Sequence, residues 1–122
     1  MLKVIENLPD HVFGVRAIGE VDKAEIEAVL LPGLQHLVDK YDEIYYLLVL
    51  ETSVKNFTAG FWWEDMKAGI KHFTKWKKIA VVTDEKAVEL ISDAFSIGVP
   101  GEAKGYPLEK EVEAVGWISN KS

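Results

Sequence analysis

The spacing of apolar residues along the chain predicts alternating strands and helices. An uninterrupted apolar run at 44–50 is typical of a strand that is buried on both faces of a parallel sheet. A shorter apolar run at 79–83 predicts a second buried strand. Between residues 23 and 40 apolar residues recur at helical spacing, and Pro32-Gly33 interrupts them. This interruption predicts one kinked helix or two short ones.

The two ends of the chain add further elements. Segments 2–6 and 12–21 flank a turn that contains Pro9 and Asp10, so we expect an antiparallel strand hairpin. At the other end, a weak edge strand at 103–106 precedes a helix that begins at Pro107. The residues of this last helix that should face inward are Val112, Val115 and Ile118.

Two more helices are predicted between the strands, at 59–73 with Thr58 as N-cap and from Asp84 to Phe95. The complete order, β-β-α-β-α-β-α-β-α, predicts a single α/β domain over residues 1–122. Its fold would be a single mixed, mostly parallel sheet of about five strands with about four helices and an N-terminal antiparallel hairpin.

Composition narrows the class of protein and its partners. The chain has 122 residues, of which 48% are hydrophobic, and it has no cysteine, which excludes disulfides and cysteine-ligated metals. A net charge of −6 argues against a nucleic-acid partner. No apolar run approaches the ~20 residues that a transmembrane helix needs. Because no secretory signal opens the sequence, we expect a cytoplasmic protein.

A cluster of aromatic residues follows the apolar run at 44–50. These residues span nearly a full helical turn, so they cannot all face one core. At least one of Phe61 and Trp63 should therefore lie near the surface, either as a partly exposed core residue or in an apolar pocket or dimer contact. The cluster consists of Phe57, Phe61, Trp62 and Trp63.

A lysine stripe comes next in the sequence. Lys67, Lys71 and Lys75 recur every four residues, and Lys77 and Lys78 follow them. The stripe is either a solvated helix face or a contact for an anionic head group or acidic partner, and it can also stabilise a helix C-terminus.

Motifs for catalysis or for a bound metal do not emerge from the sequence. The three histidines are widely separated, and none has a second ligand at a recognisable spacing, so we expect no metal. We also find no nucleophile elbow or phosphate loop, and therefore expect no cofactor and no catalytic residue. His72, beside Lys71, is the one histidine near the suspected site.

Several short segments resemble the SpoIIAA-like family of small bacterial proteins, which is related to STAS domains and to CRAL-TRIO lipid-binding domains. They are Phe57-Thr58-Ala59-Gly60, Trp63-Glu64-Asp65 and Pro100-Gly101-Glu102, and the resemblance covers almost the whole chain. In the anti-sigma-factor antagonists the matching turn, Asp-Ser-Ser-Gly, carries a phosphorylated serine. Here Phe57 replaces the aspartate and Ala59 occupies the phosphoacceptor position, which argues against a kinase switch. Thr58 keeps a hydroxyl, which we expect to cap the following helix.

The resemblance implies a non-enzymatic STAS-like binding or regulatory module, a homodimer that acts through the turn at 57–60 and the following helix. The alternative is a small carrier of a lipid or other apolar or anionic ligand in a pocket beside the same helix. Either function would use the same residues, whether the partner is a protein or a small molecule. The candidates are Phe57, Thr58, Gly60, Phe61, Trp62, Trp63, Lys67, Lys71 and His72.

Overall fold

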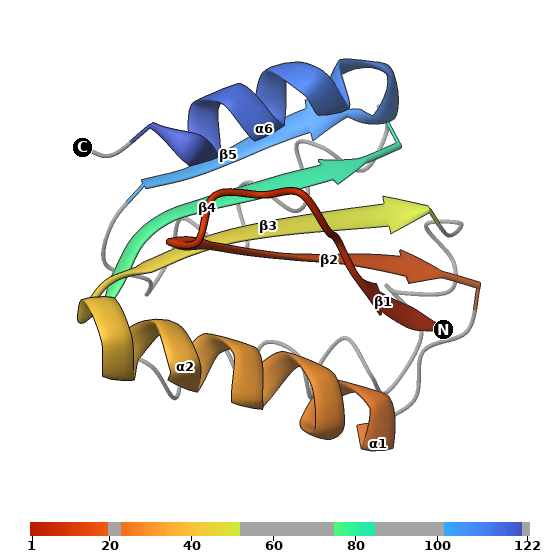
Figure 1. Ribbon diagram of the computed structural model, residues 1–122. Coiled ribbons are helices and arrows are strands. Elements are labelled where there is room, and N and C mark those ends of the chain that lie inside the picture. The colour runs from red at the N-terminus through yellow and green to blue at the C-terminus, as the bar shows by residue number, and fades with distance from the viewer. Residues whose placement is uncertain (20–22, 52–74, 85–101, 121–122) are drawn as a thin grey trace.

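One five-stranded mixed sheet forms the centre of the computed structural model, which describes residues 1–19, 23–51, 75–84 and 102–120. The strands are β1 (Leu2–Val4), β2 (Val12–Ile18), β3 (Ile44–Glu51), β4 (Trp76–Thr83) and β5 (Glu102–Pro107). They lie in the order β1-β2-β3-β4-β5; β1 is antiparallel to β2, and all other neighbours are parallel (Figure 1). The expected mixed sheet with an N-terminal antiparallel hairpin is therefore confirmed.

Helical segments cover both faces of this sheet. The first stretch consists of α1 (Lys23–Glu25), the π-helical η1 (Ile26–Leu30) and α2 (Leu31–Tyr41), and the second of the 3₁₀-helical η2 (Leu108–Lys110) and α6 (Glu111–Ser119). Figure 1 shows α2 on one side of the sheet and α6 on the other. Where the sequence predicts about four helices, the described part of the chain has these two helical stretches. The helices predicted at 59–73 and after Asp84 fall outside the described residues.

The π-helical segment accounts for the interruption predicted at Pro32-Gly33. Proline has no N–H, and its ring clashes with the carbonyl of the residue four positions earlier in a regular α-helix. The wider π turn at Ile26–Leu30 precedes the proline, which then lies in the first turn of α2 and leaves no intrahelical donor missing. Gly33 lies directly against Phe13 of β2, and a Cβ atom at this position would overlap the Phe13 ring. A glycine is therefore required for α2 to pack this closely on the sheet.

Strand β3 supplies both cores of the protein. Residues 44–50 are all buried, as the apolar run predicts, and successive side chains alternate between the faces. Tyr46 and Leu48 join the core beneath α2, whereas Leu47 and Val49 join the core beneath α6. The sheet is thus the middle layer of three, and α6 contributes Ala114 and Ile118 to its core.

The inward face of the last helix differs from the prediction in one residue. Ile118 is buried and Val115 partly so, but Val112 is 85% exposed and Ala114 is buried in its place. In the regular helix α6, at about 100° per residue, Val112 lies about 120° around the axis from Ile118, whereas Ala114 lies about 40° from it. The expected inward position of Val112 was therefore wrong, because a spacing of three residues drifts away from one helix face.

The free edge of β1 is closed by a side chain. The Leu2 N–H donates a hydrogen bond of 2.7 Å to the Glu25 carboxylate rather than to a neighbouring strand. The backbones of Met1 and Ile18 bond each other, so the Leu2 N–H points away from β2. Because the outward N–H already donates to an acidic side chain, the edge strand is less able to pair with another chain.

Candidate functional site

Several polar side chains lie at the end of the sheet where its parallel strands terminate. Glu51 is the last residue of β3, Thr83 is the last of β4 and precedes Asp84, and β5 ends at Pro107. We call this end of the sheet, with Arg16 of β2 and the η2–α6 start at 108–111, the carboxyl edge. In open α/β sheets, ligands and partners commonly bind outside the carboxyl ends of the strands. The carboxyl edge is therefore the candidate site.

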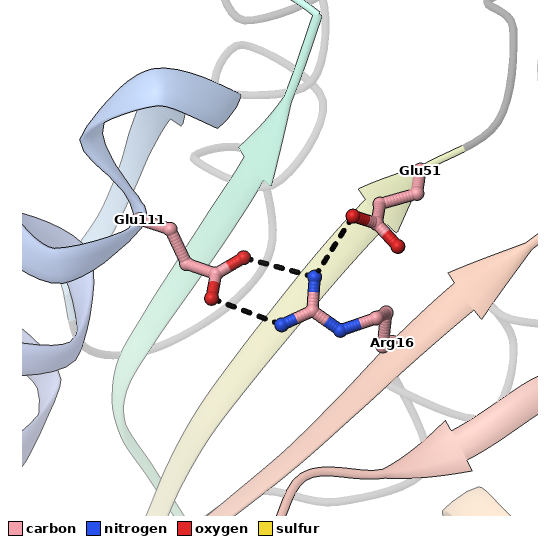
Figure 2. Close-up of polar contacts among 3 residues, drawn as sticks. All are labelled: Arg16, Glu51 and Glu111. Atoms are coloured by element: carbon pink, nitrogen blue, oxygen red, sulfur yellow. Dashed lines mark hydrogen bonds and ion pairs between the residues drawn. The ribbon is translucent and has the colours of Figure 1, made fainter.

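An ion-paired triad joins three elements at the carboxyl edge. Arg16 Nη1 and Nη2 donate hydrogen bonds of 3.0 and 2.9 Å to the two carboxylate oxygens of Glu111, and Nη1 lies 3.1 Å from Glu51 Oε1 (Figure 2). The hydrogen bonds to Glu111 raise the pKa of Arg16, and the negative charges of Glu111 and Glu51 raise it further. Partial burial of the guanidinium lowers this pKa but does not cancel the increase. The guanidinium stays charged, and the triad has a net charge of −1.

This arrangement fixes the position of α6. The bidentate pair holds the first helical turn against the sheet, and Glu111 carries its negative charge at the end of the helix where the dipole favours it. Because both carboxylates already bind the guanidinium, Arg16 does not offer an open cation to an anionic ligand. The triad is therefore a positioning device for the carboxyl edge.

Lys78 fixes the other end of the same helix. Its ammonium group is almost fully buried and donates hydrogen bonds of 3.1 and 2.8 Å to the carbonyl oxygens of Trp117 and Asn120. It also lies 4.9 Å from the centre of the Trp117 ring, within range of a cation–π interaction. His11 adds a contact 2.9 Å long between Nε2 and the Ser119 carbonyl oxygen.

The position of Lys78 corrects its grouping with the lysine stripe. The sequence places it among residues that could bind an anionic head group, but its side chain belongs to β4 and faces α6. It does stabilise a helix C-terminus, although the helix is α6 rather than one in its own segment. Lys75 remains exposed and lies 3.6 Å from Asp42 in a surface ion pair.

An open cleft of about 240 Å³ lies at the carboxyl edge beside the triad elements. Its described lining consists of Asp84, Pro107, Leu108 and Glu109. Typical pockets for drug-sized ligands begin at roughly 300 Å³ and are mostly apolar. Two of these described lining residues, Asp84 and Glu109, are acidic. Among the residues that the structure describes, no group of three His, Asp or Glu side chains is arranged to hold a metal ion.

Two buried hydroxyl groups have no hydrogen-bond partner within the described ranges. They belong to Tyr46 and to Thr83 at the end of β4. Burial raises the pKa of Tyr46, because the charged phenolate is disfavoured away from water. Tyr46 packs between the rings of Phe13 and Trp76, at centroid distances of 6.2 and 6.1 Å, in the core beneath α2. Its role is in packing rather than in the candidate site.

All the site residues predicted from the sequence, from Phe57 to His72, lie outside the described residues. Their part in a site therefore stays a prediction. The structure instead identifies Arg16, Glu51 and Glu111, which sequence reasoning did not assign to a site. One signal was available, because Arg16 interrupts an otherwise apolar strand at a position that alternates with its buried neighbours. Such a residue needs a partner of opposite charge.

Comparisons with known proteins agree with the resemblance seen in the sequence. A family model described as SpoIIAA-like matches residues 12–119. Searches of curated proteins and of solved structures returned no match. Separately, none of the helices in the described ranges is long and apolar enough to cross a membrane. Since the matched region extends from the start of β2 to the end of α6, the chain belongs to the SpoIIAA-like family.

Proposed function

We propose that this protein is a non-enzymatic regulatory module that binds a protein partner at its carboxyl edge. Membership of the SpoIIAA-like family, whose STAS relatives generally act in this way, supports the proposal. The observation that carries it is the triad, in which Arg16 connects Glu51, the last residue of β3, to Glu111 in the first turn of α6. Binding surfaces are most precise when rigid elements support them.

The contact residues in this proposal come from the segment that follows β3. The chain leaves the sheet at Glu51, on the carboxyl edge, six residues before the turn at 57–60 begins. Trp62 and Trp63 would supply large apolar contacts, and Lys67 and Lys71 positive charge for an acidic partner surface. We include a homodimer in the proposal, because exposed aromatic residues favour interfaces between copies as well as between different proteins.

A carrier of a lipid or other apolar ligand is the alternative that an experiment must separate. Native mass spectrometry of the purified full-length chain, under gentle and then denaturing conditions, distinguishes the two. We expect the mass of the protein alone, as a monomer or dimer. An extra mass that is lost on denaturation would identify a bound small molecule and replace the proposal with the carrier function.

Photo-crosslinking in the cell tests the protein-binding site directly. A photoreactive amino acid is placed at Trp63, and in a matched control at Glu27, which is exposed in η1. We expect one discrete crosslinked protein at position 63, none at position 27, and a weaker product when Lys67→Glu and Lys71→Glu are added. Equal products at both positions, or none at position 63, would contradict the proposed site.

A further inference from the structure

An exposed apolar pair lies at the start of the last helix, beside the cleft of the carboxyl edge. Val112 is 85% exposed and Leu108, one turn earlier, is 40% exposed. Leu108 also lines the cleft of about 240 Å³ together with Asp84 and Glu109. A β-branched residue on a helix surface has a lower helix propensity than alanine. Neither helix formation nor core packing therefore accounts for Val112.

Negative charges flank this apolar pair. Glu109 and Glu113 are exposed and spaced one turn apart, and neither forms an ion pair with any other residue that the structure describes. The neighbouring triad adds a net charge of −1, and Lys110 is the single basic residue between the two glutamates. We call Leu108, Glu109, Val112 and Glu113 the acidic–apolar patch. The stretch 108–113 that contains the patch has three glutamates and one lysine, a net charge of −2.

The negative charge of the acidic–apolar patch indicates which kind of partner could bind there. A negative surface repels phosphate groups, nucleic acid and anionic membranes. A second copy that met the same patch across a two-fold axis would place Glu109 and Glu113 against their own images, which is unfavourable. Two apolar residues one turn apart beside a carboxylate-lined cleft fit a helix that presents aliphatic and basic side chains on one face.

We propose that the acidic–apolar patch is a docking surface for a basic amphipathic helix of a partner protein. An aliphatic residue of that helix packs on Val112 and Leu108, and a Lys or Arg side chain enters the cleft beside Glu109. The patch uses no residue of the segment 57–72, so this inference goes beyond the proposed function and can succeed or fail independently of it.

A synthetic amphipathic helix made of leucine and lysine is the probe for this surface. Titration into the isotopically labelled full-length protein, followed by NMR, maps where the peptide binds. We expect the largest chemical-shift changes at residues 84 and 107–113, and an affinity that falls with added salt. The control peptide has glutamate in place of lysine and should not bind.

Paired variants separate a specific surface from general attraction between a basic peptide and an acidic protein. Glu109→Gln with Glu113→Gln should lower the affinity about fivefold, and Val112→Gln about tenfold. Glu27→Gln with Glu43→Gln removes the same charge in η1 and in the segment between α2 and β3, and should leave the affinity within about twofold. All of these side chains are at least partly exposed, and circular dichroism checks that the variants fold.

Three results would overturn the inference. One is an equal loss of affinity in the two paired glutamate variants, which would show that net charge alone accounts for peptide binding. Another is the absence of peptide binding, or shift changes centred on α2. The third is self-association of the protein that Val112→Gln abolishes, which would assign the patch to a second copy of the chain instead of a basic partner.

Discussion

Arg16 in β2 and Glu111 in the first turn of α6 are 95 residues apart in the sequence and form two parallel N–H···O hydrogen bonds (Figure 2). The carboxylate of Glu51, in β3, forms an ion pair with the same guanidinium. One side chain thus connects the beginning, middle and end of the chain at the carboxyl edge. The planar, five-donor shape of arginine makes this possible, because a lysine ammonium cannot form the fork.

Replacing Arg16 with lysine tests whether this fork stabilises the fold. Arg16→Lys keeps the positive charge but loses the bidentate geometry, and we expect the free energy of unfolding to fall by about 1 kcal/mol in urea denaturation. The control is Lys75→Gln, which removes an ion pair to Asp42 whose side chains are 51% and 74% exposed. This control should change stability by less than about 0.5 kcal/mol. Equal losses in the two variants would show that the fork contributes nothing beyond a surface ion pair.

Lys78→Met tests the buried ammonium at the C-terminus of α6. Methionine keeps most of the apolar stem but leaves the Trp117 and Asn120 carbonyl groups without this donor. We expect a loss of about 2 kcal/mol in unfolding free energy and faster hydrogen exchange at the amides of 115–119. Lys77→Met, one residue earlier in β4, is the matched control and should leave that exchange unchanged. Unchanged protection of α6 in Lys78→Met would refute the role of the ammonium.

Gly33→Ala tests the close packing of α2 on β2. Alanine improves helix propensity by up to about 1 kcal/mol, but its Cβ atom overlaps the Phe13 ring. We expect the steric overlap to outweigh the gain in helix propensity, so that the free energy of unfolding falls by about 1 kcal/mol. Adding Phe13→Leu should remove most of the penalty that alanine causes, which a double-mutant cycle measures. Gly116→Ala in α6, where no described atom beyond the adjacent residues and the helix's own backbone lies within 4 Å of the added Cβ, should stabilise the protein instead.

Tyr46→Phe tests the buried hydroxyl and gives a pH dependence. Removing a buried hydroxyl with no partner in the described ranges should stabilise the protein by about 1 kcal/mol at neutral pH. Burial raises the pKa of Tyr46 above its usual 10.0. Above pH 10 the unfolded chain releases this proton while the folded protein keeps it, so stability falls as the pH rises.

The alkaline loss should disappear in the variant. Relative to Tyr46→Phe, the wild-type protein should lose about 1.4 kcal/mol per pH unit above pH 10, as measured by urea denaturation at successive pH values. Tyr41→Phe is the control, because Tyr41 is partly exposed and should follow the wild type. Parallel pH profiles for Tyr46→Phe and the wild type would contradict the burial effect.

Local pattern was sufficient to predict the strands but not the polar contacts between them. The apolar run at 44–50 identified β3, because a strand covered on both faces leaves no polar position. The interruption before Pro32 followed from proline geometry, although its π-helical form did not. By contrast, the partner of Arg16 lies 95 residues away, and no local spacing reveals it.

The errors in the sequence interpretation have two physical causes. Val112 was placed inward with Val115 and Ile118 at a spacing of three residues, but six residues of α-helix turn Val112 about 120° away from Ile118. Lys78 was grouped with the preceding lysines by sequence proximity, whereas it belongs to the next strand, whose alternation points it at α6. The Lys78 case shows that the spacing of charges is informative only within one regular element.

The place of α6 at the far end of the chain has a consequence for synthesis on the ribosome. The sheet face that carries Tyr45, Leu47 and Val49 is covered, within the described part of the chain, by the last helix to be translated. Until residues 111–119 emerge, this face has neither Ala114 and Ile118 against it nor the Arg16 clamp that holds them there. Between the translation of β3 and that of α6, the nascent chain therefore lacks the described cover of this aliphatic face, and a holding chaperone would be of most use in that period.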